Sequence, residues 1–274
     1  APALCLLSEI VNDDGSMARG QSLMDFAAKN SIPVISVEEL KALAEAGAAE
    51  LNSLRKANPD QPEATAEAVI AWVAKHFGVE SIAVACSMAD SVLPAVVAKQ
   101  IPDVEVLFLE TGYHFAETHA TRDEVARVLP VKILDVKPKQ TVAEQDAQYG
   151  EKLYQRDPNL CCQLRKVDPL NNVLKSFELW FTGVRRDEAE TRTYTELVQW
   201  DEKNGLVKVN PLAAWTFDEL IDYATEHKVP VNLLLSNGYP SIGCEPCTKP
   251  VAPGEDPRSG RWAGANKVEC GLHL

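Results

Sequence analysis

The sequence predicts an α/β protein with a mostly parallel sheet and helices on both faces. Short apolar runs recur along the chain, and the segments between them are long enough for helices that cross back over a sheet. The runs lack polar alternation, as expected for strands that are buried on both faces. They are SIAVA (81–85), VEVLFL (104–109), VKILDV (131–136) and LWFTG (179–183).

Residues 1–62 are expected to form an N-terminal helical segment. Part of it is rich in alanine and acidic residues, and Ser36 with Glu39 three positions later forms a capping-box signature. The pattern changes near residue 63, where AEAVIAWVAKHFG has apolar residues on one helical face. We therefore place the main α/β domain at 63–250.

The later part of the chain begins with LVQWDEKNGLVKV, which predicts a hairpin that turns at Asn204 and Gly205. Thr216 and Glu219 then form the capping box of another helix. Residues 251–274 are rich in proline and glycine without a clear period. We expect them to form a mobile C-terminal tail.

Charge and hydropathy limit the partners of the chain. Its 274 residues carry 27 basic and 40 acidic side chains, a formal charge of -13. This charge argues against nucleic acid and anionic membranes as partners, so an anionic ligand needs a local basic cluster. No apolar run approaches the roughly 20 residues of a membrane span, and the first residues lack a basic signal region. We expect a cytoplasmic protein, and the sequence is compatible with a homo-oligomer.

The cysteines point to metal or thiol chemistry. There are seven, an odd number that is a poor basis for a disulfide framework. Cys161 and Cys162 are adjacent, and Cys244 and Cys247 form a CxxC pair, so four thiolates can converge on zinc or on an iron–sulfur cube. Adjacent cysteines strain a single small ion, which favours the cube. The remaining candidate is Cys270, an accessible thiol in the glycine-containing ECGLHL.

Several segments are candidates for binding an anion. CSMADS (86–91) follows the first predicted strand, where free backbone N–H groups hold phosphate or sulfate in many proteins. LETG (109–112) ends the second strand with a glycine that permits close approach of a ligand. Arginines bind polyanions in a bidentate fashion. The candidates are Arg185, Arg186 and Arg192 after the fourth strand, and Arg258 and Arg261 in the tail.

These motifs occur together in one known family. The ordered set CC with RK, LETG, TGVRRDEAETR, GYPSIGCEPCT, RSGRW and ECGLHL resembles the assimilatory adenylylsulfate (APS) reductases. They are a branch of the phosphoadenylylsulfate (PAPS) reductase family. The resemblance extends over roughly residues 63–274, and the first 60 residues add nothing to it.

The resemblance implies an adenine nucleotide alpha hydrolase-like fold and a [4Fe–4S] cluster on Cys161, Cys162, Cys244 and Cys247. It implies that Cys270 attacks the sulfur of adenosine 5'-phosphosulfate, that AMP leaves, and that thioredoxin or a similar dithiol releases sulfite from the thiosulfonate. This reaction belongs to assimilatory sulfate reduction and cysteine biosynthesis. The implied substrate contacts are Cys86, Ser87, Asp90, Leu109, Gly112, Lys166, Arg185, Arg186, Arg192, Arg258, Arg261 and His273.

The chain departs from the family pattern at the first loop. Cys86 stands where a serine is common and Ser87 where a glycine is common, whereas Asp90 matches. LETG replaces the commoner LDTG, and Pro158 stands where a histidine is often found.

Two alternative functions remain open. A PAPS reductase without a cluster usually lacks both cysteine pairs. An ATP pyrophosphatase-type enzyme with structural zinc needs an SGGKDS-like loop, and CSMADS has neither glycine nor lysine.

Overall fold

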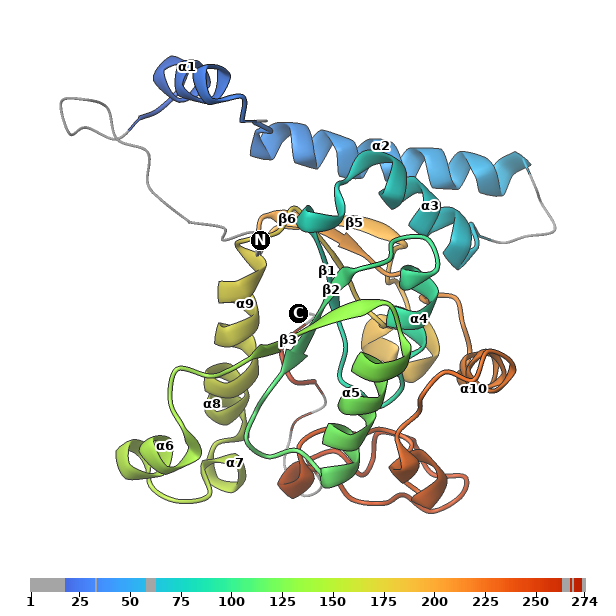
Figure 1. Ribbon diagram of the computed structural model, residues 1–274. Coiled ribbons are helices and arrows are strands. Elements are labelled where there is room, and N and C mark those ends of the chain that lie inside the picture. The colour runs from blue at the N-terminus through green and yellow to red at the C-terminus, as the bar shows by residue number, and fades with distance from the viewer. Residues whose placement is uncertain (1–17, 33, 58–62, 263–266, 268, 273–274) are drawn as a thin grey trace.

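The protein is built on one six-stranded sheet (Figure 1). The computed structural model describes residues 18–32, 34–57, 63–262, 267 and 269–272. The strand order is β3-β2-β1-β4-β6-β5, with β1 near the centre. The strands are β1 (Ile82–Ala85), β2 (Val104–Leu109), β3 (Val131–Val136), β4 (Leu179–Phe181), β5 (Val198–Asp201) and β6 (Leu206–Val209).

Strand pairing confirms the predicted parallel sheet and its hairpin. The pairs β3–β2, β2–β1, β1–β4 and β4–β6 are parallel, and β5 pairs antiparallel with β6 at the edge. The hairpin turns through Gly205 at φ 69°, a left-handed conformation that glycine adopts without steric cost. The fourth strand ends at Phe181, two residues earlier than predicted, so Gly183 already belongs to the loop at the carboxyl edge.

Helices connect the strands and cover the sheet on both sides. Among the described residues, the regular helices are α1 (Gln21–Asn30), α2 (Val37–Ala57), α3 (Ala66–His76), α4 (Val92–Ala98), α5 (Ala116–Val128), α6 (Val142–Tyr149), α7 (Leu153–Arg156), α8 (Pro158–Cys162), α9 (Asp168–Leu174) and α10 (Phe217–Glu226). Shorter turns of helix are η1 (Val79–Ser81), the π-helical η2 (Gln163–Val167), η3 (Arg186–Glu188), η4 (Glu190–Arg192), η5 (Leu233–Asn237) and η6 (Glu245–Cys247). None of the described helices is long and apolar enough to cross a membrane.

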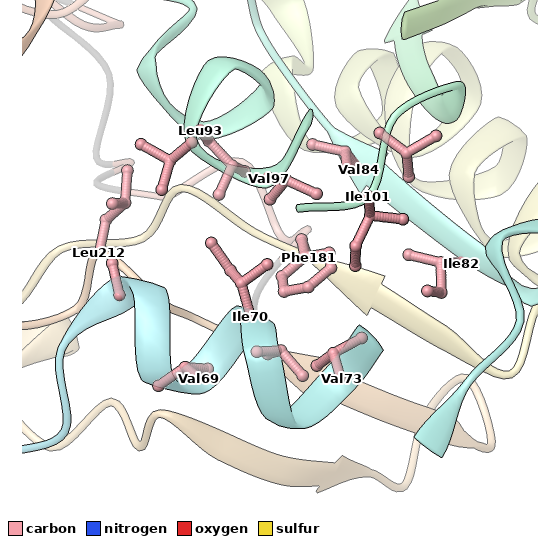
Figure 2. Close-up of a cluster of buried hydrophobic side chains, with 14 of the residues drawn as sticks. Val69, Ile70, Val73, Ile82, Val84, Leu93, Val97, Ile101, Phe181 and Leu212 are labelled. Atoms are coloured by element: carbon pink, nitrogen blue, oxygen red, sulfur yellow. The ribbon is translucent and has the colours of Figure 1, made fainter. Parts of the chain in front are cut away.

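The larger core lies between one face of the sheet and the helices α3 and α4. Ile82 and Val84 point to this face because alternate residues of a strand share a side (Figure 2). Ile70 of α3 and Val97 of α4 pack in the same cluster. The cluster also includes Leu40, Ala44 and Leu51, so α2 of the predicted N-terminal segment shares the core of the main domain.

The second face carries a smaller core on which α9 packs. Ala83 and Trp180 point to this side, where they meet Leu170 of α9. Figure 1 shows α9 on the opposite side of the sheet from α4 and α5. Leu272 of the C-terminal segment packs against the same cluster. The tail therefore contributes to the cover of this face, close to where the strands end.

Capping boxes begin helices where the sequence predicts them. The Ser36 N–H donates to Glu39 Oε2 over 2.7 Å, and the Glu39 N–H donates to Ser36 Oγ over 3.1 Å. Thr216 and Glu219 make the same reciprocal pair at α10. Each box gives hydrogen-bond partners to helix N–H groups that have none within the helix.

Candidate active site

A cavity of about 230 Å³ opens where the parallel strands end. Ligands of open α/β sheets bind at this edge because loops from several strands converge there. The cavity is lined by residues that follow β1, β2 and β4 and by parts of the C-terminal segment. The structure brings together these predicted site residues: Cys86, Ser87, Asp90, Leu109, Lys166, Arg185, Arg192, Arg258, Arg261 and Cys270.

Three other predicted substrate contacts are not among the lining residues. Arg186 turns elsewhere, because its guanidinium donates to Glu63 and to the carbonyl oxygen of Thr195. Gly112 has φ 73°, and a Cβ there would lie 3.1 Å from Arg165 Nη2, so this glycine permits close packing of Arg165. His273 lies outside the described residues.

The loop after β1 is a compact turn with a neutral thiol. Cys86 Sγ lies 3.3 Å from the carbonyl oxygen of Asp90, and Asp90 Oδ1 accepts a hydrogen bond from the Val92 N–H over 3.0 Å. Burial and the nearby Asp90 charge raise the pKa of Cys86 to about 12. Burial also raises the pKa of Asp90 above its ordinary value. Cys86 therefore lines the cavity as a protonated thiol and is a poor nucleophile.

The arginines after β4 are held by carboxylates. Arg185 Nε lies 3.1 Å from Asp187 Oδ1, and its Nη2 lies 3.8 Å from Glu188 Oε1. Arg192 Nη1 contacts the other oxygen of Glu188. These contacts restrict the positions of the two guanidinium groups. An arrangement of cations that is fixed in advance in this way would suit a site for an anion.

The arginines near the C-terminus form a pair of like charges. Arg261 Nη1 donates to Ser241 Oγ over 3.2 Å and to the Ile242 carbonyl oxygen over 3.3 Å. Its Nε is buried and has no hydrogen-bond partner among the described residues. Burial and the neighbouring charge of Arg258 lower the pKa of Arg261. A bound anion would relieve both costs, because it supplies an acceptor and a compensating charge.

The C-terminal segment docks into this site along its described residues. Glu269 Oε1 and Oε2 each lie 2.9 Å from the guanidinium of Arg192, and Oε2 lies 3.2 Å from Arg258 Nη2. Lys203 Nζ donates to the carbonyl oxygen of Gly271 over 3.1 Å. Cys270, between these anchors, is partly buried and lines the cavity. The expected mobility of the tail stays a prediction, since the structure shows its docked position.

The two predicted cysteine pairs meet beside the main cavity. Cys161 and Cys162 at the end of α8 line a small cavity together with Cys244 and Cys247. Burial, followed by the charges of the other three cysteines, raises the pKa of Cys161 to about 12. Burial likewise raises the pKa of Cys247 to about 11. Within the described ranges, no three His, Cys, Asp or Glu side chains are already arranged to hold a metal ion.

The surroundings of the four thiols fit a group of negative charge. Arg165, Lys166 and Arg261 line the same small cavity. Burial disfavours the Lys166 charge, but negative charge on the sulfurs of Cys244 and Cys270 raises the pKa of Lys166 above its ordinary value. Four soft thiolate donors with three cations suit an iron–sulfur cluster, whose ligands make its net charge negative. Lys166 lines both cavities and connects them electrostatically.

The matches to known proteins agree with this geometry. The Phosphoadenosine phosphosulfate reductase domain matches residues 81–250, more than half of the chain. The chain belongs to this family. An Adenosine 5'-phosphosulfate reductase from Streptomyces coelicolor is 50% identical over 87% of this chain and 96% of its own length. A protein of the same name from Mycolicibacterium smegmatis is 52% identical over 86% of this chain and 95% of its own.

Solved structures support the fold of this phosphoadenosine phosphosulfate reductase family member. A phosphoadenylyl-sulfate (PAPS) reductase from Candida auris, solved as a phosphate complex, aligns with a TM-score of 0.59 at 24% identity. It covers 80% of this chain and 99% of its own. An FMN adenylyltransferase from Candida glabrata in complex with ATP aligns at 0.50 and 10% identity, over 82% of this chain and 70% of its own. These likenesses confirm the adenine nucleotide alpha hydrolase-like fold.

Three residues of this family member escaped the sequence prediction. Arg165, 4% exposed, donates to the carbonyl oxygens of Thr111 and Gln140 and so connects η2 to the loops after β2 and β3. His114 lines the cavity, and burial lowers its pKa. Glu269 is acidic, whereas an anion site predicts cations. Its position next to Cys270 is the sequence signal that could identify it.

Proposed function

We propose that this chain reduces adenosine 5'-phosphosulfate to sulfite and AMP with Cys270 as the nucleophile. The observation that carries the proposal is the placement of Cys270 in one cavity with Lys166, Arg192, Arg258 and Arg261. Relatives of about 50% identity that bear the name Adenosine 5'-phosphosulfate reductase indicate the substrate. Cys86 shares the cavity, but its raised pKa makes it the weaker candidate.

The first step is a sulfonyl transfer to a thiolate. Cys270 Sγ attacks the substrate sulfur and forms an S–S bond while the S–O bond to the phosphate of AMP breaks. AMP leaves with the electron pair of that bond, and its growing negative charge is stabilised by the arginines that line the cavity. Lys166, which is near enough to Cys270 for their charges to interact, supplies further positive charge. The product on the enzyme is a Cys270 thiosulfonate.

The second step needs a dithiol, and we propose thioredoxin or a similar protein. One thiolate of the dithiol attacks Cys270 Sγ, and the S–S bond to the sulfonate breaks so that sulfite leaves with the electron pair. The second thiolate of the dithiol then resolves the mixed disulfide and restores the Cys270 thiolate. The dithiol is oxidised by two electrons and sulfur is reduced by two. A reducing compartment such as the cytoplasm supplies this partner.

We also propose that Cys161, Cys162, Cys244 and Cys247 hold a [4Fe–4S] cluster. The bound cluster would add negative charge beside Lys166 and order the loop that carries the CxxC pair. Protein purified without air should be brown and contain iron and acid-labile sulfide. Colourless protein that contains zinc would contradict the cluster and favour a structural zinc site.

The decisive test compares substrates and a single variant. Sulfite release is measured from APS and PAPS in parallel, with thioredoxin as reductant, for the wild type and Cys270→Ser. We expect release from APS by the wild type and none by the variant, which should still bind AMP. Peptide mass spectrometry after a turnover without reductant should find an SO₃ adduct on Cys270. Normal sulfite release by Cys270→Ser would refute the nucleophile, and a preference for PAPS would support the alternative PAPS reductase.

A further inference from the structure

The carboxylate of Glu269 occupies guanidinium groups that line the cavity. We propose that Glu269 is a positioning residue: it holds Cys270 in the site by binding Arg192 and Arg258, and it competes with an anionic substrate for Arg192. The contact with Arg258 keeps residue 269 in place while the anion is bound. We call the contacts of Glu269 with Arg192 and Arg258 the Glu269 clamp. The identity of the anion rests on the proposed function, whereas the clamp rests on the geometry alone.

The clamp is nearly closed to solvent. The side chain of Glu269 is 7% exposed, that of Arg192 12% and that of Arg258 14%. Both oxygens of Glu269 accept from Arg192, through Nε and Nη2 at 2.9 Å each. Thr191 Oγ1 adds a hydrogen bond to Oε1 at 3.3 Å. A bidentate carboxylate–guanidinium pair restricts the orientation of the carboxylate, so it limits how far residue 269 can move from Arg192.

The position of Glu269 determines that of Cys270. Consecutive Cα atoms lie about 3.8 Å apart, so a fixed Glu269 leaves Cys270 a short radius of movement. On the other side, the Gly271 carbonyl oxygen accepts from Lys203, an exposed side chain, and Leu272 packs on the smaller core. Of these anchors, the Glu269 clamp is the buried charged one. It is therefore the anchor whose loss should displace the thiol most.

The clamp also reduces the capacity of the arginines for substrate. Arginine has five N–H donors, and Arg192 directs Nε and Nη2 at Glu269 and Nη1 at Glu188. A phosphate that approaches Arg192 finds the Nε–Nη2 face taken by Glu269 and meets a carboxylate of its own sign. It can make a bidentate contact with that face only when Glu269 leaves it. Removing the Glu269 charge should therefore strengthen anion binding while it weakens the hold on Cys270.

The test uses the full-length holoenzyme with Glu269→Gln and the matched control Glu255→Gln. Glu255 is an exposed carboxylate of the same segment that accepts a hydrogen bond from the Ala252 N–H and lies outside the clamp. Three quantities are measured for each protein: the Kd of AMP by calorimetry, kcat and KM for APS with thioredoxin, and the rate of Cys270 alkylation by iodoacetamide. Circular dichroism checks that the variants are folded.

For Glu269→Gln we expect an AMP Kd at least fivefold lower, a kcat at least tenfold lower and faster alkylation of Cys270. The control should stay within twofold of the wild type in all three. An unchanged kcat would overturn the positioning role, and an AMP Kd that is unchanged or higher would overturn the shared subsite. A wild type that releases no sulfite from APS would remove the proposed function instead. The alkylation rate still tests the clamp in that case, because the alkylation measurement needs no substrate.

Discussion

Arg165 offers a sharp test of how η2, which follows the adjacent cysteines, is attached to the segments after β2 and β3. The residue is 4% exposed, and its guanidinium donates to the Thr111 carbonyl oxygen, to the Gln140 carbonyl oxygen at 3.3 Å and to Gln145 Oε1 at 3.2 Å. Arg165→Met keeps the aliphatic stem but leaves these acceptors without a donor. A buried polar group that loses its partner costs about 1–3 kcal/mol. The effects are not additive, so we expect about 3–5 kcal/mol in the free energy of unfolding.

Arg156→Met is the matched control for this prediction. Arg156 also donates to backbone carbonyl oxygens, those of Glu151 at 3.1 Å, Tyr149 at 2.6 Å and Gly150 at 2.7 Å, but it is exposed. Water replaces its hydrogen bonds, so the expected cost is below about 1 kcal/mol. Urea unfolding followed by tryptophan fluorescence measures both variants. If they differ by less than about 1 kcal/mol, burial is not what makes Arg165 important.

Three further predictions concern the cavity and the tail. Because burial and the Asp90 charge raise the pKa of Cys86 to about 12, iodoacetamide at pH 8 should label Cys270 well before Cys86 in peptide maps, and equal labelling of folded protein would contradict the neutral thiol. Burial raises the pKa of Glu269, but Arg192 and Arg258 lower it more, to a net value below the ordinary 4.5. The stability that the Glu269 carboxylate contributes is therefore fully present above pH 4.5 and is lost as the pH falls through the lowered pKa. The difference in unfolding free energy between wild type and Glu269→Gln should accordingly shrink only below pH 4.5. Gly260→Ala should lower the Tm, because its Cβ would lie 2.2 Å from the Lys249 carbonyl oxygen. An unchanged Tm would show that the backbone before Arg261 can shift to make room.

Much of the fold follows from local patterns. The apolar runs identify β1 to β4, and the Asn204–Gly205 turn identifies the hairpin of β5 and β6, because strand burial and turn chemistry are properties of a few consecutive residues. The capping boxes at Ser36 and Thr216 were predicted for the same reason. The packing of α2 on the core of the main domain was not predicted, because an apolar helix face indicates burial but not the surface that it covers.

The site shows the same division. Arg185 and Arg186 are neighbours in an arginine-rich loop, and sequence treats them alike, yet Arg185 lines the cavity while Arg186 contacts Glu63. The direction of each side chain depends on the turn of η3 and on the residues that come near it, which are far away in sequence. Glu269 likewise becomes meaningful only when the tail reaches Arg192.

Residue types and their order predict the class of chemistry: paired cysteines for a cluster, strand-end arginines for an anion, and a thiol near the carboxyl end. Those signals lie in the chemical nature of each side chain, which the chain carries before it folds. Which cations meet the anion, and which carboxylate already holds them, depends on charges brought together from distant segments in a site of low dielectric. Their energies arise from that proximity and burial, and these exist after folding alone.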